Sequence, residues 1–158
     1  MKSMHRGILV GLLQCLIVLS VAGKYAIDRE RLPRVWVNAT PVDPELPLRG
    51  RYVSLRLQVE MPDGFIGVYA PVRLHVEAGR LRATPDRENG GLTVTRFQQR
   101  PWTLTEPVAF YLPEHAADPS RRAPGEELWV EVSVPRNGPP RPLRLAVKKE
   151  GKLTPLAW

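Results

Sequence analysis

The chain has 158 residues, which is enough for one domain with an appendage and too few for two full domains. Its composition, 43% hydrophobic and 25% charged, is typical of a globular protein and excludes a disordered chain. The net charge is +7, but the basic residues do not form the dense Lys/Arg cluster of a nucleic-acid surface, and the stacking aromatics of such a surface are missing. We therefore expect no nucleic-acid partner.

The first segment, "MKSMHRGILVGLLQCLIVLSVAGK", has the composition of a membrane element. Lys2 and Arg6 precede an apolar run from Gly7 to Gly23, which would span roughly 26 Å as a helix, close to the thickness of a bilayer core. We therefore predict a transmembrane anchor over residues 1–24. The positive-inside rule places its N-terminus in the cytoplasm and the remaining chain on the periplasmic or extracellular side.

A cleaved signal peptide is the alternative interpretation of this segment. The small residues of "SVAG" (Ser20–Gly23) suit a cleavage site, but the apolar run is longer than an ordinary signal-peptide core. The one cysteine, Cys15, lies inside the run, so no disulfide can form within the chain and no cysteine-based metal site can be built.

After a charged juxtamembrane linker over residues 25–33, residues 34–158 read as a β-rich domain. All 17 prolines lie at or after Pro33 and divide this part into short windows of strand length. Several windows alternate between apolar and polar residues, the period of a half-buried strand. The alternating windows are centred on Val53–Val59, Val72–Val76, Leu128–Val134 and Leu143–Val147, and weaker strand candidates are Arg34–Ala39, Phe65–Ala70, Leu81–Thr84, Leu92–Phe97 and Val108–Leu112.

The connections between these windows carry turn residues. Hairpins are predicted at "EAGR" (Glu77–Arg80) and at Asn137-Gly138, with turns at "MPDG" (Met61–Gly64) and Gly151. Residues 113–127 read mainly as a loop with one short helical turn at most. Many short strands joined by hairpins predict a mainly β fold: an N-terminal transmembrane helix followed by a single antiparallel β-sandwich or partly open β-barrel.

Groups that could support catalysis are sparse. We interpret His75 as a solvent-facing strand residue and His115 as an exposed loop residue, and we expect no metal and no cofactor. No nucleophile elbow, zinc-protease motif or phosphate-binding glycine loop occurs in the sequence, so we expect no catalytic residues.

Three arginines, Arg56, Arg73 and Arg144, fall on the polar faces of strongly predicted strands. If those strands were neighbours, the arginines would form a ladder suited to anionic headgroups or an acidic partner. The alternative is an ordinary surface on which they pair with Glu60, Glu77 and Glu131 across strands.

The stretch "PVDPELPLRGRYVSLRL" resembles the signature region of the GDYXXLXY protein family. The family-motif positions matched are Pro41, Asp43, Pro44, Arg49, Gly50, Tyr52 and Leu55. The sequence departs at Arg51, where the family has aspartate, and at Leu57, where it has the final tyrosine. The order around the motif is also similar, with an N-terminal membrane helix before it and "GVYAPV" after it.

The resemblance implies a bacterial protein anchored in the inner (cytoplasmic) membrane by a single span, with an exported β domain and without an assigned reaction. Family members tend to accompany multi-span membrane proteins, so it implies an accessory subunit with a membrane-protein partner. We therefore predict a non-catalytic, membrane-anchored envelope protein with an interaction domain. Two other hypotheses remain. One is an envelope enzyme or ligand-binding domain using Asp43, Glu45, Arg49 and Tyr52. The other is a headgroup-binding tether using Arg56 and Arg73.

Overall fold

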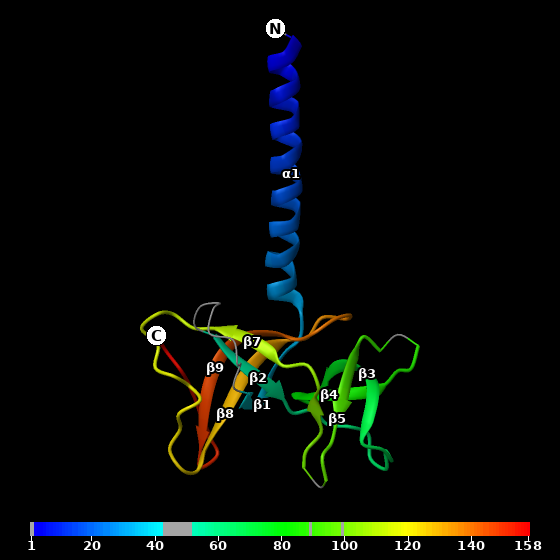
Figure 1. Ribbon diagram of the computed structural model, residues 1–158, viewed down its shortest axis with the longest axis vertical. Coiled ribbons are helices and arrows are strands. Elements are labelled where there is room, and N and C mark those ends of the chain that lie inside the picture. Colours follow the sequence, from blue (N-terminus) through cyan, green and yellow to red (C-terminus); the bar gives the residue numbers. More distant parts are fainter. Residues whose placement is uncertain (1, 43–51, 89, 99) are drawn as a thin grey trace. The chain divides into compact units, whose positions relative to one another are not determined.

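A computed structural model describes residues 2–42, 52–88, 90–98 and 100–158 of the chain. The chain divides into two units, with the boundary between Leu32 and Pro33 (Figure 1). The first unit is one long helix and the second is built of strands. The fold is thus mainly β with an N-terminal apolar helix and antiparallel sheets, as predicted.

Helix α1 covers Lys2–Arg31 and contains the predicted membrane segment. Its stretch Gly7–Ile27 has 21 residues and is long and apolar enough to cross a membrane, and none of it is buried against the rest of the protein. The helix also continues through most of residues 25–33, which we expected to form a separate linker. Pro33 explains where it stops, because a proline disfavours helical geometry at the residue before it.

The second unit contains two antiparallel sheets among its described residues. The larger sheet has the strand order β10-β9-β8-β1-β2-β7 and the smaller one β4-β3-β5-β6. The strands are β1 (Arg34–Val42), β2 (Tyr52–Leu57), β3 (Tyr69–Glu77), β4 (Arg80–Pro85), β5 (Leu92–Thr95), β6 (Thr103–Leu104), β7 (Val108–Tyr111), β8 (Glu126–Ser133), β9 (Arg141–Lys149) and β10 (Lys152–Pro155).

The alternating windows supply the core as predicted. Val53, Leu55, Leu57 and Val59 are all buried, and Leu55 and Leu57 are completely so. Rows from β1, β3 and β8 join them in one cluster that both sheets share. The predicted row of β9 is only partly confirmed, because Leu145 joins the cluster while Leu143 and Val147 are half-buried. A single hydrophobic core therefore stabilises the whole β domain.

The prediction for the polar face of β8 was wrong. Glu131 and Ser133, expected to face solvent, are buried. Glu131 lies opposite Trp36 of β1 and opposite Arg144 of β9, whose Nε donates a 2.7 Å hydrogen bond to it. Large neighbours on both sides thus cover a carboxylate that the alternation pattern places in water.

Two short strands and one boundary also differ from the sequence-based expectation. Strands β6 and β10 are two and four residues long, respectively, too short for a recognisable alternation. The window Phe65–Ala70 becomes a strand only at Tyr69. Before that point Gly67 adopts φ 152°, outside strand geometry, and Phe65 packs edge-on against Trp102.

The predicted turns at Gly79 and Gly151 are confirmed. Ala78 and Gly79 have φ angles of 49° and 72°, and Glu150 and Gly151 have 50° and 82°. Two successive residues with positive φ make the two-residue turn that matches the twist of a hairpin. These turns connect β3 to β4 and β9 to β10.

The segment Gln58–Glu60, directly after β2, joins the two sheets. Gln58 forms a bridge with Thr103 of β6, while Glu60 forms one with Arg82 of β4. Because β4 and β6 are the two edges of the smaller sheet, this segment closes a circuit of hydrogen-bonded neighbours around it. The smaller sheet is thereby curled into a half-barrel, and the bridges cover part of its two edge strands.

Candidate functional site

The family-motif positions that the structure describes are strand residues. Pro41 of β1 pairs with Leu55 of β2, whose side chain is completely buried. Tyr52 lies beside Tyr111 of β7, with ring centroids 6.0 Å apart. The remaining matched positions, which lie outside the described residues, are Asp43, Pro44, Arg49 and Gly50.

The alternative active site depends on the same part of the chain. Asp43, Glu45 and Arg49 lie outside the described residues, and Tyr52 is the one member of the set that is described. Their convergence on a pocket therefore stays a prediction.

Both histidines of the β domain are exposed, as expected. The Nε2 atom of His75 lies 3.8 Å from a carboxylate oxygen of Glu77, and His115 lies in the loop between β7 and β8. Among the described residues, no three His, Cys, Asp or Glu side chains gather closely enough to hold a metal ion.

The predicted arginine ladder is wrong. Arg73 belongs to β3 in the smaller sheet, whereas Arg56 and Arg144 belong to strands of the larger sheet that two other strands separate. Arg73 instead pairs with Asp86 at 2.8 Å. Of the alternative cross-strand pairs, Arg144 with Glu131 is confirmed.

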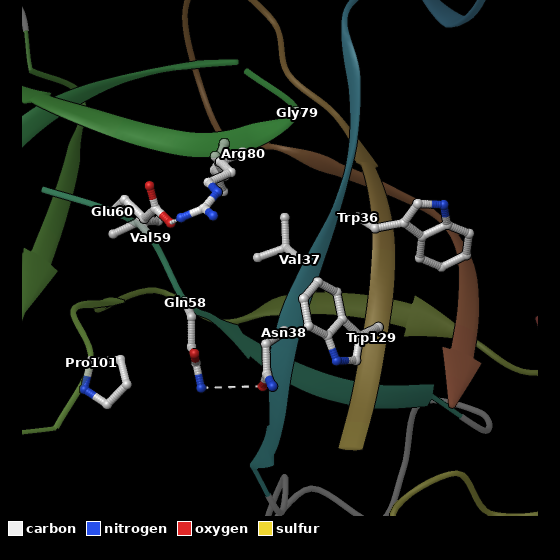
Figure 2. Close-up of a pocket in the computed structure, with 11 residues that line it drawn as sticks. Trp36, Val37, Asn38, Gln58, Val59, Glu60, Gly79, Arg80, Pro101 and Trp129 are labelled. Carbon is white, nitrogen blue, oxygen red and sulfur yellow. Dashed lines mark hydrogen bonds and ion pairs between the residues drawn. The ribbon is translucent and has the colours of Figure 1, made fainter. Parts of the chain in front are cut away.

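A groove opens where β1 and the segment Gln58–Glu60 separate to enter different sheets. Its volume is about 500 Å³, and the buried side chains of Val37, Val59 and Leu81 lie at its base. Figure 2 shows Glu60 and Arg80 on one side of Val37, with Asn38 and Trp129 on the other. The other residues that line the groove are Trp36, Gln58, Gly79 and Pro101.

A chain of hydrogen bonds holds the polar wall of this groove. Gln58 Nε2 donates to Asn38 Oδ1 at 3.1 Å, and Asn38 Nδ2 donates to Glu127 Oε2 at 3.2 Å (Figure 2 draws the first bond). Trp129 Nε1 donates to the same oxygen of Glu127 at 3.0 Å. These bonds fix the side chains of Gln58 (directly after β2), Asn38 (β1) and Trp129 (β8) relative to one another.

The opposite wall is an ion pair. Arg80 Nη1 donates to Glu60 Oε1 at 2.7 Å, and Arg82 lies 3.6 Å from the other oxygen of Glu60. Arg82 also binds Glu77 at 2.9 Å. These charged groups separate the groove from a second hollow of about 530 Å³ on the other side of Glu60, which His75 and Trp102 help to line.

Cationic side chains lie over both indoles of the groove. Lys148 Nζ is 4.4 Å from the ring centroid of Trp129, and the guanidinium carbon of Arg144 is 5.7 Å from that of Trp36. The hydrogen bond to Glu131 raises the pKa of Arg144 above its ordinary value, so this cation keeps its charge at any physiological pH. Such contacts favour one orientation of each ring.

Four exposed apolar residues, Ile66, Val68, Tyr69 and Phe97, lie on two adjacent segments at one end of β3 and β5, and we call them the apolar patch. Ile66 is 96% exposed, and the other three are between 59% and 69% exposed. The two segments lie side by side, because the Arg96 N–H donates to the Val68 carbonyl at 2.9 Å. Exposed apolar side chains on neighbouring segments are a feature of interaction sites.

The sequence reasoning missed both the groove and the patch. The groove is assembled from segments that are distant in sequence, and the available signal was the two tryptophans placed in the polar rows of predicted strands. The patch residues were assigned to strands whose apolar face would be covered, although Ile66, Val68 and Phe97 lie outside the strands and Tyr69 is the first residue of β3.

Comparison with known proteins does not identify this arrangement. No protein-family model matches the chain, and neither the curated proteins nor the solved structures contain a match to it.

Proposed function

We propose that this protein is a single-pass membrane protein of the bacterial inner membrane that displays a β-rich interaction domain on the exported side. The observation that carries the proposal is the exposure of α1 over Gly7–Ile27. In water such a surface would be strongly unfavourable, whereas a bilayer covers it completely.

The orientation rests on the charges that flank the apolar run. Lys2 and Arg6 precede it, and no acidic residue occurs before Asp28. Under the positive-inside rule, these two cations keep the N-terminus in the cytoplasm and the β domain follows on the other side. Detection of a peptide that contains Cys15 in the mature membrane-bound protein would support a retained anchor, and a mature chain that begins near Gly23 would contradict it.

We assign the apolar patch as the docking surface for a membrane-protein partner. Its centre is apolar, while Arg96 beside it and the exposed Arg100 supply positive charge at the rim. A partner with an apolar contact surface and carboxylates at its rim fits this pattern, since interfaces combine an apolar core with complementary charge.

Residues next to the patch pack against one another. The ring of Trp102, which is 7% exposed, contacts Phe65 edge-on with centroids 5.5 Å apart and lies 5.0 Å from the guanidinium carbon of Arg96.

The resemblance to the GDYXXLXY family supports the same role, because it implies an accessory subunit of a multi-span membrane protein. We propose no reaction for the domain. The patch, rather than the motif region, is the surface on which we expect the partner to dock.

Site-specific photocrosslinking tests this proposal. A photoreactive amino acid is placed at position 66, at position 97, or at the control position 111, where Tyr111 is 72% exposed on the larger sheet. Membranes are then extracted in mild detergent, and adducts are identified by mass spectrometry. We expect one multi-span membrane protein to be crosslinked from positions 66 and 97 but not from position 111.

A charge in the patch gives the matched test. Ile66→Asp should abolish the adduct from position 97, because it buries an unpaired carboxylate in the interface, while Tyr111→Asp should leave it intact. Recovery of the protein alone, or equal adducts from all three positions, would contradict the proposal.

A further inference from the structure

The groove between Trp129 and the Glu60–Arg80 ion pair has the chemistry of a ligand site distinct from the docking patch. We propose that it binds a neutral saccharide. Its volume of about 500 Å³ falls within the range of pockets that hold small molecules. The groove and the patch share no residue, so the two proposals stand independently.

The charges in the groove favour a neutral ligand. Glu60 and Arg80 are the charged groups in its lining, and they pair at 2.7 Å. Of the two cations over the indoles, Arg144 pairs with Glu131 at 2.7 Å, and Lys148 lies opposite Glu127 in the sheet. Glu127 adds a carboxylate at the outer edge, where it accepts hydrogen bonds from Asn38 and Trp129. Because carboxylates and cations are balanced around the groove, its charges favour neither an anion nor a cation.

The polar wall suits a ligand with many hydroxyl groups. The side chains of Asn38 and Gln58 each present an amide that both donates and accepts, and Glu60 presents an acceptor. Adjacent hydroxyls on a sugar ring donate and accept in the same way. The bonds from Gln58 to Asn38 and from Asn38 to Glu127 hold these groups in place before binding. Binding therefore costs less side-chain entropy than it would with freely rotating amides.

The apolar part of the groove suits the other property of a sugar, its C–H faces. Trp36 and Trp129 contribute half-buried indoles, and Val37, Val59 and Leu81 form the base. A cation lies over one face of each indole, so the sugar would contact the remaining exposed parts of the rings. Indoles provide large, rigid apolar contact with little loss of conformational entropy. The combination of aromatic and hydroxyl-binding walls separates a saccharide from a purely apolar ligand, which would leave the amides unpaired.

Titration of the full-length protein with defined sugars tests the inference. The protein is held in a detergent without a sugar headgroup and titrated with triacetylchitotriose, cellotriose and maltotriose. Binding is followed by saturation-transfer NMR and by tryptophan fluorescence. We expect at least one of the three to bind saturably below about 10 mM. Trialanine serves as the peptide control and should not bind.

Variants locate the binding site. Trp129→Ala should weaken binding at least about tenfold, and Trp129→Phe, which keeps an aromatic face, should restore most of it. Gln58→Ala removes one amide from the polar wall and leaves both tryptophans in place, and it should also weaken binding. Trp158→Ala, at an exposed tryptophan outside the groove lining, should leave it unchanged.

Thermal melting of each variant separates loss of binding from loss of folding. The inference is overturned if none of the three sugars binds saturably, or if trialanine binds as well as the sugars. It is also overturned if folded Trp129→Ala and Gln58→Ala bind as tightly as the parent protein.

Discussion

Helix α1 and the β domain use the same kind of residue in opposite ways. Leu9, Leu16 and Leu19 of the helix are 67% to 70% exposed, whereas Leu55, Leu57 and Leu128 of the strands are completely buried. The strands provide each other with an apolar environment, whereas none of the stretch Gly7–Ile27 is buried. The β unit is stabilised by its own core, and the exposed surface of α1 is the basis of our proposal that lipid covers it.

The largest contrast should come from shortening a leucine in each unit. Leu57→Ala should destabilise the β domain by about 2–5 kcal/mol, because it leaves a cavity in a completely buried site. Leu12→Ala, in the exposed part of α1, should change the same quantity by less than about 0.5 kcal/mol. All four tryptophans lie in the β domain, so urea unfolding followed by tryptophan fluorescence reports on that unit. Equal effects of the two changes would contradict the comparison.

A charge in α1 should have the opposite pattern of effects, weakening membrane insertion and leaving the stability of the β domain unchanged. Leu16→Arg places an arginine near the centre of the apolar span, at an expected cost of about 2.5–3.5 kcal/mol for membrane insertion. The membrane-bound fraction after alkaline carbonate extraction measures this cost, with Leu16→Phe as the control that keeps the site apolar. The urea midpoint of the β domain should not change. A Leu16→Arg protein that stays fully membrane-bound would show that α1 is held there by something other than lipid.

Glycine-to-alanine changes compare how tightly the β domain and α1 are packed, because each adds one Cβ atom to the space around the glycine. A Cβ added to Gly90 would collide with the carbonyl oxygen of Asp86 and lie 2.9 Å from the backbone nitrogen of Val72, so Gly90→Ala should cost about 1–3 kcal/mol. Gly91 and Gly11 have nothing within 4 Å of such a Cβ, so alanine there should be nearly neutral. Thermal melting measures all three. A neutral Gly90→Ala would mean that the loop before β5 is packed more loosely than described.

The smallest effect should come from an exposed ion pair of the β domain. The hydrogen bond from Lys149 lowers the pKa of Glu126 below its ordinary value of 4.5. A carboxylate whose pKa is lowered by folding contributes stability above its unfolded pKa, and the contribution is lost as the pH falls through the folded pKa. Between pH 6 and a pH below about 4.5, the parent protein should therefore lose slightly more stability than Lys149→Met. Identical pH profiles would show that solvent screens the pair completely.

Sequence reasoning predicted the parts of this fold that depend on local patterns. The apolar run of α1, the alternation of Val53–Val59 and the turns at Gly79 and Gly151 each carry their signal within a few residues. The burial of Glu131 and the bridging role of Gln58–Glu60 could not be predicted in this way. Both depend on which strands are neighbours, and the chain order does not determine that.

The groove illustrates the same limit. Trp36, Gln58, Arg80 and Trp129 come from β1, the extension of β2, β4 and β8, and the groove exists because β1 and Gln58–Glu60 diverge into different sheets. A strand pattern shows that a tryptophan lies on a polar face. It does not show which polar side chains the tryptophan will meet.

Protease accessibility in spheroplasts tests the central claim most directly. We expect protease added from outside to digest the β domain of the full-length protein, while a fragment containing Gly7–Ile27 remains in the membrane after carbonate extraction. Release of the intact chain by carbonate would contradict the anchor. Protection of the β domain in intact spheroplasts, with digestion only after lysis, would contradict its exported position.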